Sequence, residues 1–189
     1  MCLDPPDNAV VLSADEKTCI PARPPVSPTL PTAPGLVERC ELEHRRAGVA
    51  CLFAALDVRS GQITHEAKDR SRAEDLVAFL EHLDEVAPAG LMLHIVADNG
   101  SSHTPEDTRK RLAHPDRKER FVLHHTPTHA SWLSQVELFF SILTRRLVKR
   151  GELASVPDLV ARLGAFIADY TAPAKPFKWT YEGKPLKAA

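Results

Sequence analysis

The chain lacks the features of secreted, membrane-spanning and zinc-ribbon proteins. It contains no apolar run near the ~18–20 residues that cross a bilayer, and residues 1–10 have neither the basic nor the apolar segment of a signal peptide. The four cysteines show no C-x-x-C spacing, which argues against a zinc ribbon or a dithiol redox motif. We therefore expect a reduced, cytoplasmic protein with a packed core, since 43% of the residues are hydrophobic.

A large net charge is also missing, but the charged residues are unevenly distributed. The 189 residues carry a formal net charge of −1. Residues 1–108 have 9 basic and 18 acidic side chains, a balance of −9, whereas residues 109–189 have 15 basic and 7 acidic ones, a balance of +8. Such asymmetry is typical of proteins that bind a polyanion, and it also fits two parts that fold against each other. Composition alone leaves both interpretations open.

The hydrophobic pattern predicts an α/β fold in which a mixed sheet is flanked by helices. Apolar runs predict strands at 9–14, 49–58, 63–69, 91–97 and 120–125, the second and third joined by a hairpin turn. Helical spacing predicts helices at 71–87, 104–112, 132–150 and 157–170, the first with a capping box from Ser71 to Glu74. Six prolines within residues 21–34 predict an extended loop, part of an insertion at 21–46.

Three carboxylates stand out by their positions in these elements. Asp15 and Asp98 each follow a short apolar run, so we expect them at the carboxyl ends of strands, where open α/β sheets collect active-site residues. Glu137 interrupts an apolar stretch near the start of the long helix. Three acids in one place need a countercharge, and oxygen ligands suit Mg²⁺ or Mn²⁺. Two such ions roughly 3.5–4 Å apart would support phosphoryl transfer.

Each carboxylate also has a simpler explanation. Asp15 or Asp98 would equally cap a loop at the end of a strand, and Glu137 would stabilise a helix N-terminus through the helix dipole. Asp57 ends an apolar run as well and is the main alternative to Asp15 as the first acid. The positions of the acids alone leave these interpretations open.

Short motifs around these acids point to a family. Residues 98–103 read D-N-G-S-S-H, of the form D-N-x-x-x-H, residues 125–132 read H-T-P-T-H-A-S-W, and residues 135–137 read Q-V-E. Residues 14–17 read A-D-E-K. Together these motifs closely resemble the DDE-type transposases of the insertion-sequence-630 family, in the mariner-like superfamily. The resemblance runs from about Asn8 to about Trp179.

The resemblance implies an RNase H-like fold, shared with retroviral integrases, over residues 1–172, with a C-terminal tail at 173–189. It assigns the catalytic and metal-binding roles to Asp15, Asp98 and Glu137, and so favours Asp15 over Asp57. The implied cofactor is a pair of Mg²⁺ (or Mn²⁺) ions. The implied reaction is hydrolysis of a phosphodiester at a transposon end, followed by attack of the freed 3′-hydroxyl on target DNA, commonly at TA dinucleotides. The implied partners are transposon-end DNA, target DNA and a second copy of the chain.

Further polar residues have candidate supporting roles. Asn99 and His103 are auxiliary candidates beside the second acid, although a loop histidine is often structural. His124, His125 and His129 lack the cysteine partners of common zinc sites, so we favour packing and DNA contact. Basic side chains cluster on both sides of the expected strand at 120–125, where they would neutralise the DNA backbone or form a solvated surface. They are Arg109, Lys110, Arg111, Arg117, Lys118, Arg120, Arg145, Arg146 and Lys149.

Two departures from the family pattern bear on function. Ser134 stands where the family often has Asn, and a hydroxyl can still form the hydrogen bond. The N-terminal helix-turn-helix domain of the family is not found in this sequence, so we expect a catalytic domain only. Two alternatives follow: a catalytically idle remnant that only binds DNA or dimerises, and a ribonuclease of the same fold. We expect a bacterial cytoplasmic location, near the nucleoid.

Overall fold

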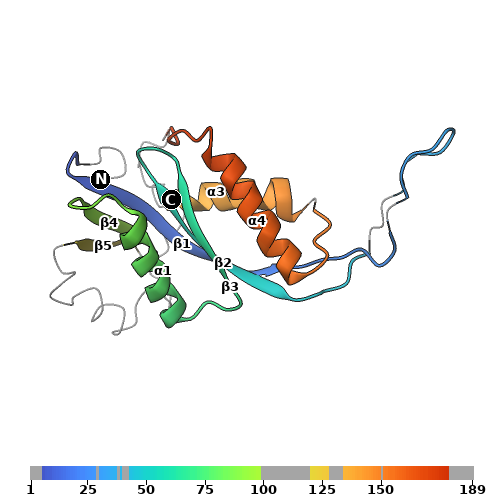
Figure 1. Cartoon of the computed structure of the whole chain (residues 1–189), viewed down its shortest axis with the longest axis horizontal. Coiled ribbons are helices and arrows are strands. Elements are labelled where there is room, and N and C mark those ends of the chain that lie inside the picture. The colour runs from blue at the N-terminus through green and yellow to red at the C-terminus, as the bar shows by residue number, and fades with distance from the viewer. Residues whose placement is uncertain are drawn as a thin grey trace, which may run out of the picture.

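The computed structural model describes residues 6–28, 30–37, 39, 43–98, 120–127, 134–149 and 151–178 (Figure 1). The strands are β1 (Ala9–Pro21), β2 (Val49–Asp57), β3 (Ile63–Lys68), β4 (Met92–Ala97) and β5 (Phe121–His125). The helices are α1 (Ala73–Val86), α3 (Val136–Leu143), the π-helix η2 (Thr144–Val148) that continues it, and α4 (Val156–Thr171). No helix in these ranges is long and apolar enough to cross a membrane.

The five strands form one mixed sheet in the order β3-β2-β1-β4-β5, so β1 is the central strand. β1 and β2 pair antiparallel, as do β2 and β3, whereas β1 pairs parallel with β4 and β4 parallel with β5. Ser13 is the partner of Val96 in the parallel register. Asp15 and Asp98 each follow these partners by two residues, so the register brings them to the same level along the strands and to the same face of the sheet.

Each face of the sheet has its own apolar core. Leu12, Ala14 and Phe53 belong to a cluster that packs against α1, which contributes Phe79 and Leu83. A second cluster packs the opposite face against α3 and α4, with members such as Leu52, Ala54, Phe139, Phe140, Leu159 and Leu163. The predicted fold of a mixed sheet flanked by helices is therefore confirmed.

β1 is longer than the sequence predicts. We expected a strand at 9–14 that ends at Asp15, whereas β1 continues to Pro21 because β2 supplies antiparallel partners, Leu52 for Lys17 and Ala50 for Ile20. Asp15 therefore lies inside the central strand, with 7% of its surface exposed. The prediction that Asp15 terminates a strand is wrong, since pairing with β2 rather than the local apolar run decides where β1 ends.

The described residues between 22 and 48 form an extended arm that leads away from the sheet (Figure 1). Isolated bridges join Pro25 to His44, Leu30 to Arg39 and Ala33 to Leu36, and Gly35 adopts a φ of 80° at the turn. The prolines lack the N–H groups of a regular ladder, which explains why bridges replace strands here. The stretch is extended as predicted, but it forms one side of a two-sided arm rather than a free loop.

Two helix starts differ from the prediction. The capping box from Ser71 to Glu74 is wrong, because the N-cap of α1 is Arg72, whose N–H donates to the Asp75 carboxylate at 3.1 Å. α3 begins at Val136 rather than at 132, since residues 134 and 135 precede its first helical residue. The helix expected at 104–112 lies outside the described residues. The helix expected at 157–170 and the strands expected at 49–58, 91–97 and 120–125 are confirmed within one residue at each end.

Candidate active site

The central strand presents its polar side chains on the face that α3 covers. Side chains alternate along a strand, and Leu12 and Ala14 pack towards α1, so Ser13, Asp15 and Lys17 lie on the opposite face. Asp15 is buried in the body of the sheet, beside its cross-strand partner Ala54. One of its carboxylate oxygens accepts a hydrogen bond from the Glu16 N–H at 2.8 Å.

Asp98 follows directly on β4, the parallel neighbour of β1, as the sequence predicts. Its backbone carbonyl and the Nδ1 atom of His125 lie 3.2 Å apart. The N–H of Thr126 donates to the carbonyl of Ala97 at 2.9 Å, so the pairing of β4 with the chain after β5 continues up to this acid. These backbone contacts fix the position of Asp98 at the carboxyl end of β4.

Glu137 lies in the first turn of α3, also as predicted, and a buried serine pair fixes that turn against β1. The hydroxyls of Ser13 and Ser134 are 3.1 Å apart, and the Ser13 hydroxyl also accepts the N–H of Val136 at 3.2 Å. The Glu137 N–H donates to the Ser134 carbonyl at 3.2 Å. Ser134 therefore does form a buried hydrogen bond. Sequence reasoning missed Ser13, whose only signal was a hydroxyl two positions before Asp15 in an apolar run.

The other two acids act electrostatically on Glu137. Burial raises the pKa of Glu137 above its ordinary value, and the negative charge of Asp15 raises it further. A side-chain hydrogen bond with Asp15 and the charge of Asp98 act in the same direction, while the positive charge of Lys17 opposes them. Three elements that are far apart in sequence thus place their carboxylates within reach of one another's charge.

The donor set fits a hard divalent cation, although the side chains are not arranged around one. Within the described ranges, no group of three His, Cys, Asp or Glu side chains is placed to hold a metal ion. The three acids nevertheless offer only oxygen atoms as ligands. A bound cation would reduce the repulsion between their negative charges. Asp15, Asp98 and Glu137 are therefore the residues that could hold Mg²⁺ or Mn²⁺ in this part of the chain.

Asp57, the alternative first acid, has a structural role instead. It ends β2, and its carboxylate accepts hydrogen bonds from the Arg59 N–H at 2.9 Å and from the Ser60 hydroxyl at 2.6 Å. These contacts are typical of an Asx turn, and they close the hairpin between β2 and β3. Asp15, rather than Asp57, is the acid of the first two strands that lies near Glu137.

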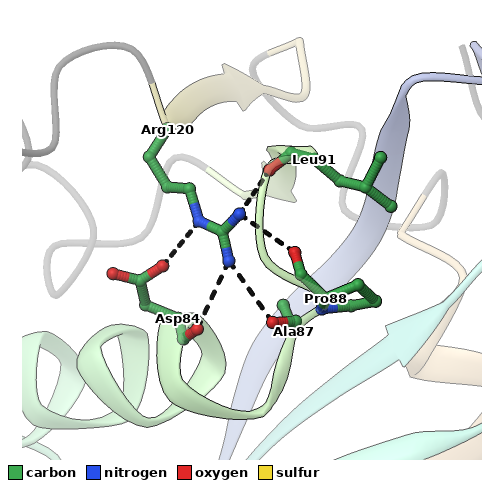
Figure 2. Close-up of polar contacts among 5 residues, drawn as sticks. All are labelled: Asp84, Ala87, Pro88, Leu91 and Arg120. Atoms are coloured by element: carbon green, nitrogen blue, oxygen red, sulfur yellow. Dashed lines mark hydrogen bonds and ion pairs between the residues drawn. The ribbon is translucent and has the colours of Figure 1, made fainter.

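Arg120 is engaged within the protein, because its guanidinium group closes the C-terminal end of α1 (Figure 2). Its Nε atom donates to the Asp84 carboxylate at 2.7 Å. Its Nη1 atom donates to the carbonyls of Pro88 and Leu91, at 3.0 and 2.7 Å, and its Nη2 atom to the carbonyls of Asp84 and Ala87, both at 3.4 Å. These hydrogen bonds of Arg120 could not be predicted from the sequence, since the partners lie 29 to 36 residues away.

The other predicted DNA contacts fall into two groups. Arg145, Arg146 and Lys149 are exposed on η2 and just after it, as a role in DNA binding requires. Arg146 also lines a cavity of about 390 Å³ that Phe166, Asp169, Tyr170 and Lys175 share. The remaining candidates lie outside the described residues, as do the auxiliary candidates. They are Asn99, His103, Arg109, Lys110, Arg111, Arg117 and Lys118.

The histidines of β4 and β5 form a pair on the same face as the acids. The Nδ1 atom of His94 and the Nε2 atom of His124 are 2.9 Å apart, with ring planes at 9°. Burial lowers the pKa of His124, and the neighbouring His94 lowers it further. His124 thus packs between strands, as favoured above, and His129 lies outside the described residues.

Solved structures share this fold. A chain of the simian T-cell lymphotropic virus intasome, in complex with PP2A regulatory subunit B56 gamma, aligns with a TM-score of 0.59 and 16% identity over 96% of this chain and 60% of its own. The Mos1 mariner paired-end complex with Mn gives a TM-score of 0.58 and 18% identity over 84% and 48%. The Mos1 strand transfer complex aligns with a TM-score of 0.55 and 17% identity, over 84% of this chain and 47% of its own.

These alignments confirm the RNase H-like fold of transposase and integrase catalytic cores. The chain spans about half to three-fifths of the length of the solved chains that it matches. No curated protein sequence matches it significantly. A family model described as "DDE superfamily endonuclease" matches residues 10–160, which is well over half of the 189 residues. The chain therefore belongs to the DDE superfamily endonuclease family.

Proposed function

We propose that this chain is the catalytic domain of a transposase that cleaves DNA and transfers strands with the help of divalent metal ions. The observation that carries the proposal is that β1 and β4 place Asp15 and Asp98 on one face of the sheet, where both act on Glu137 of α3. Membership of the DDE superfamily endonucleases supports it. We assign the catalytic domain to residues 1–172 and a C-terminal tail to 173–189, and we place the protein in the insertion-sequence-630 family on the motifs described above.

In the proposed mechanism the three carboxylates would hold two Mg²⁺ or Mn²⁺ ions. When bound, the ions supply Lewis-acid activation of the phosphodiester and of the attacking oxygen. Asp15 contributes from a rigid central strand, which limits the movement of its carboxylate. Ser13 and Ser134 tie β1 to the first turn of α3 and so set the distance between Asp15 and Glu137. Asn99 and His103, which follow Asp98 in the sequence, remain proposed auxiliary residues.

The proposed partners are transposon-end DNA, target DNA and a second copy of the chain. Complexes of Mos1 with a transposon end and after strand transfer share the fold, which supports the choice of substrate. We propose that basic residues neutralise the DNA backbone. These residues are Arg109, Lys110, Arg111, Arg145, Arg146 and Lys149. We also propose a bacterial cytoplasmic location, near the nucleoid.

The test is cleavage of a plasmid that carries the genomic segments flanking the coding sequence, by the purified full chain in Mg²⁺ or Mn²⁺. We expect Asp98→Asn to lower the cleavage rate by about a thousandfold or more, because losing one of the carboxylates removes several kcal/mol of transition-state stabilisation. Asp57→Asn is the matched control. It should leave the rate within about threefold of the wild type, since Asp57 contacts a hairpin turn.

Three results would contradict the proposal in different ways. Equal cleavage by wild type and Asp98→Asn would exclude the assigned site. Binding of DNA and metal by the wild type without any cleavage would identify a catalytically idle remnant. Cleavage of an RNA–DNA hybrid without strand transfer to DNA would identify a ribonuclease of the same fold.

A further inference from the structure

The polar face of β1 continues past Asp15 to a cation. Lys17 follows Asp15 by two residues, so it lies on the same face of the strand about 6.6 Å further along. β1 is still paired at this point, with Leu52 of β2 as the partner of Lys17. The backbone that carries this lysine is therefore as well fixed as the backbone that carries the first acid.

The side chain of Lys17 reaches across to α3. Its Nζ atom lies 5.8 Å from the centre of the Phe140 ring, and Phe140 follows Glu137 by three residues, or about one helical turn. Phe140 is buried, with 1% of its surface exposed, so the ring is a fixed contact. A cation over an aromatic face keeps its N–H groups for other partners. Among the described residues, the ammonium group forms no ion pair or hydrogen bond.

The charge of Lys17 acts on the acid cluster. It is the one positive charge in the described part of the chain that acts on Glu137, where it opposes the negative charges of Asp15 and Asp98. A DNA phosphate that approaches the three carboxylates is repelled by their negative charges, so a positive charge nearby is needed to offset this repulsion. The ammonium group of Lys17 lies at the margin of the cluster, on the face from which the carboxylates project.

We propose that Lys17 binds a non-bridging oxygen of the DNA phosphate that is held at the carboxylate cluster. This inference rests on the proposed function, because it assigns a substrate contact to the same site. Lysine is a common phosphate ligand that acts as a compact point charge. The contact with Phe140 holds the ammonium group near the place where the phosphate must lie, which lowers the entropic cost of forming the bond.

The first test measures DNA binding by fluorescence anisotropy, with the full chain, a labelled duplex and Ca²⁺ as the divalent ion. Lys17→Met keeps the length of the side chain and its apolar contact with Phe140 but removes the charge. We expect this variant to bind DNA about 3- to 10-fold more weakly and to lower the slope of log K against log salt concentration by about 1. Lys17→Arg should keep the wild-type slope.

The matched control is Lys68→Met, the same substitution on the other face of the sheet. Lys68 lies on β3 and pairs with Glu66 at 2.7 Å, away from the acid cluster. We expect it to leave both affinity and salt slope at wild-type values. A Lys17→Met variant that matches the wild type in both quantities would show that Lys17 does not contact DNA.

The second test identifies the phosphate. A duplex with a methylphosphonate at the cleaved position lacks the charged oxygen, so its effect and that of Lys17→Met should not add in a double-mutant cycle of affinities. Additive effects would overturn the proposed contact. A changed metal requirement in Lys17→Met with an unchanged salt slope would overturn it as well, because that second result would mean that Lys17 positions Glu137 instead. Failure of the wild type to bind or cleave any DNA would instead overturn the proposed function.

Discussion

The two faces of the sheet differ in how their helices cover them. On one face, α1 packs along an apolar surface in which the tilted rings of Phe53 and Phe79 have their centres 5.8 Å apart. On the other face, α3 and α4 bury β2 and β3, while the same face of β1 and β4 carries Ser13, Asp15 and His94. The candidate site therefore lies where apolar coverage of the sheet stops. One face contributes only to stability, whereas the other contributes to stability at β2 and β3 and carries the candidate site at β1 and β4.

Truncating a core side chain on each face should have the largest effect, and it tests whether the two faces differ in function. Phe79→Ala removes a fully buried ring on the α1 side, and we expect it to lower the free energy of unfolding by about 3–5 kcal/mol. DNA cleavage per folded molecule should stay near the wild-type rate, because Asp15 lies on the opposite face of the sheet. Urea denaturation and cleavage assays at a temperature where the variant is folded check both expectations.

Phe139→Ala is the counterpart of that variant on the other face. Phe139 is equally buried and lies two residues after Glu137. The centres of its ring and the Tyr170 ring are 5.1 Å apart. We expect a similar loss of stability together with a loss of cleavage, since α3 loses its support. Equal cleavage by the two folded variants would show that the two faces do not differ in function.

A smaller change tests the serine contact that holds α3 to β1. Ser13→Ala leaves the Val136 N–H and the Ser134 hydroxyl without their buried partner, which should cost about 1–2 kcal/mol of stability. We expect cleavage to fall as well, because the first turn of α3 carries Glu137. Ser155→Ala is the control, since it removes the N-cap of α4 at a cost of about 1 kcal/mol away from the acids. A fall in cleavage of the same size in both variants would exclude a positioning role for Ser13.

The smallest effect concerns the histidine pair of β4 and β5. Burial and His94 lower the pKa of His124 in the folded state, so its contribution to stability is complete above pH 6.5 and is lost as the pH falls from there through the lowered pKa. The unfolding free energy of the wild type should therefore fall between pH 7.5 and 5.5, by less than ~1 kcal/mol for this partly exposed group.

Urea denaturation at the two pH values checks this expectation. His124→Gln should show a smaller decrease than the wild type, with the remainder due in part to His65, whose pKa burial also lowers. An equal decrease in both proteins would exclude His124 as a source of the acid dependence.

The sequence predicted the sheet and its flanking helices, because each element rests on a local pattern. Apolar runs indicate the strands, and Asp98 follows a strand whose bounds are correct within one residue. Glu137 lies in the first turn of a predicted helix, although α3 is shorter than the range expected. The prediction that Asp15 ends its strand was wrong, because the end of β1 depends on β2, which begins 28 residues after Pro21. The local pattern contains no information about that pairing.

The remaining contacts could not be predicted for the same reason. The bond from Ser13 to Ser134 spans 121 residues, and Arg120 reaches carbonyls at the end of α1. In a single sequence, an arginine that closes a helix end has the same signature as one that binds a phosphate. The sequence therefore predicted which residue types gather near the site but not which of them are already engaged.

The order of the strands has a consequence for synthesis of the protein on the ribosome. β1 is the centre of the sheet, yet its parallel neighbour β4 begins at Met92, 71 residues after β1 ends at Pro21. At ~5–20 residues per second, β1 waits roughly 4–14 seconds for this partner. During that interval it can pair only with β2, and one edge of an apolar strand stays open. The strand that carries the first acid is therefore also the one most in need of protection from aggregation while the chain is being made.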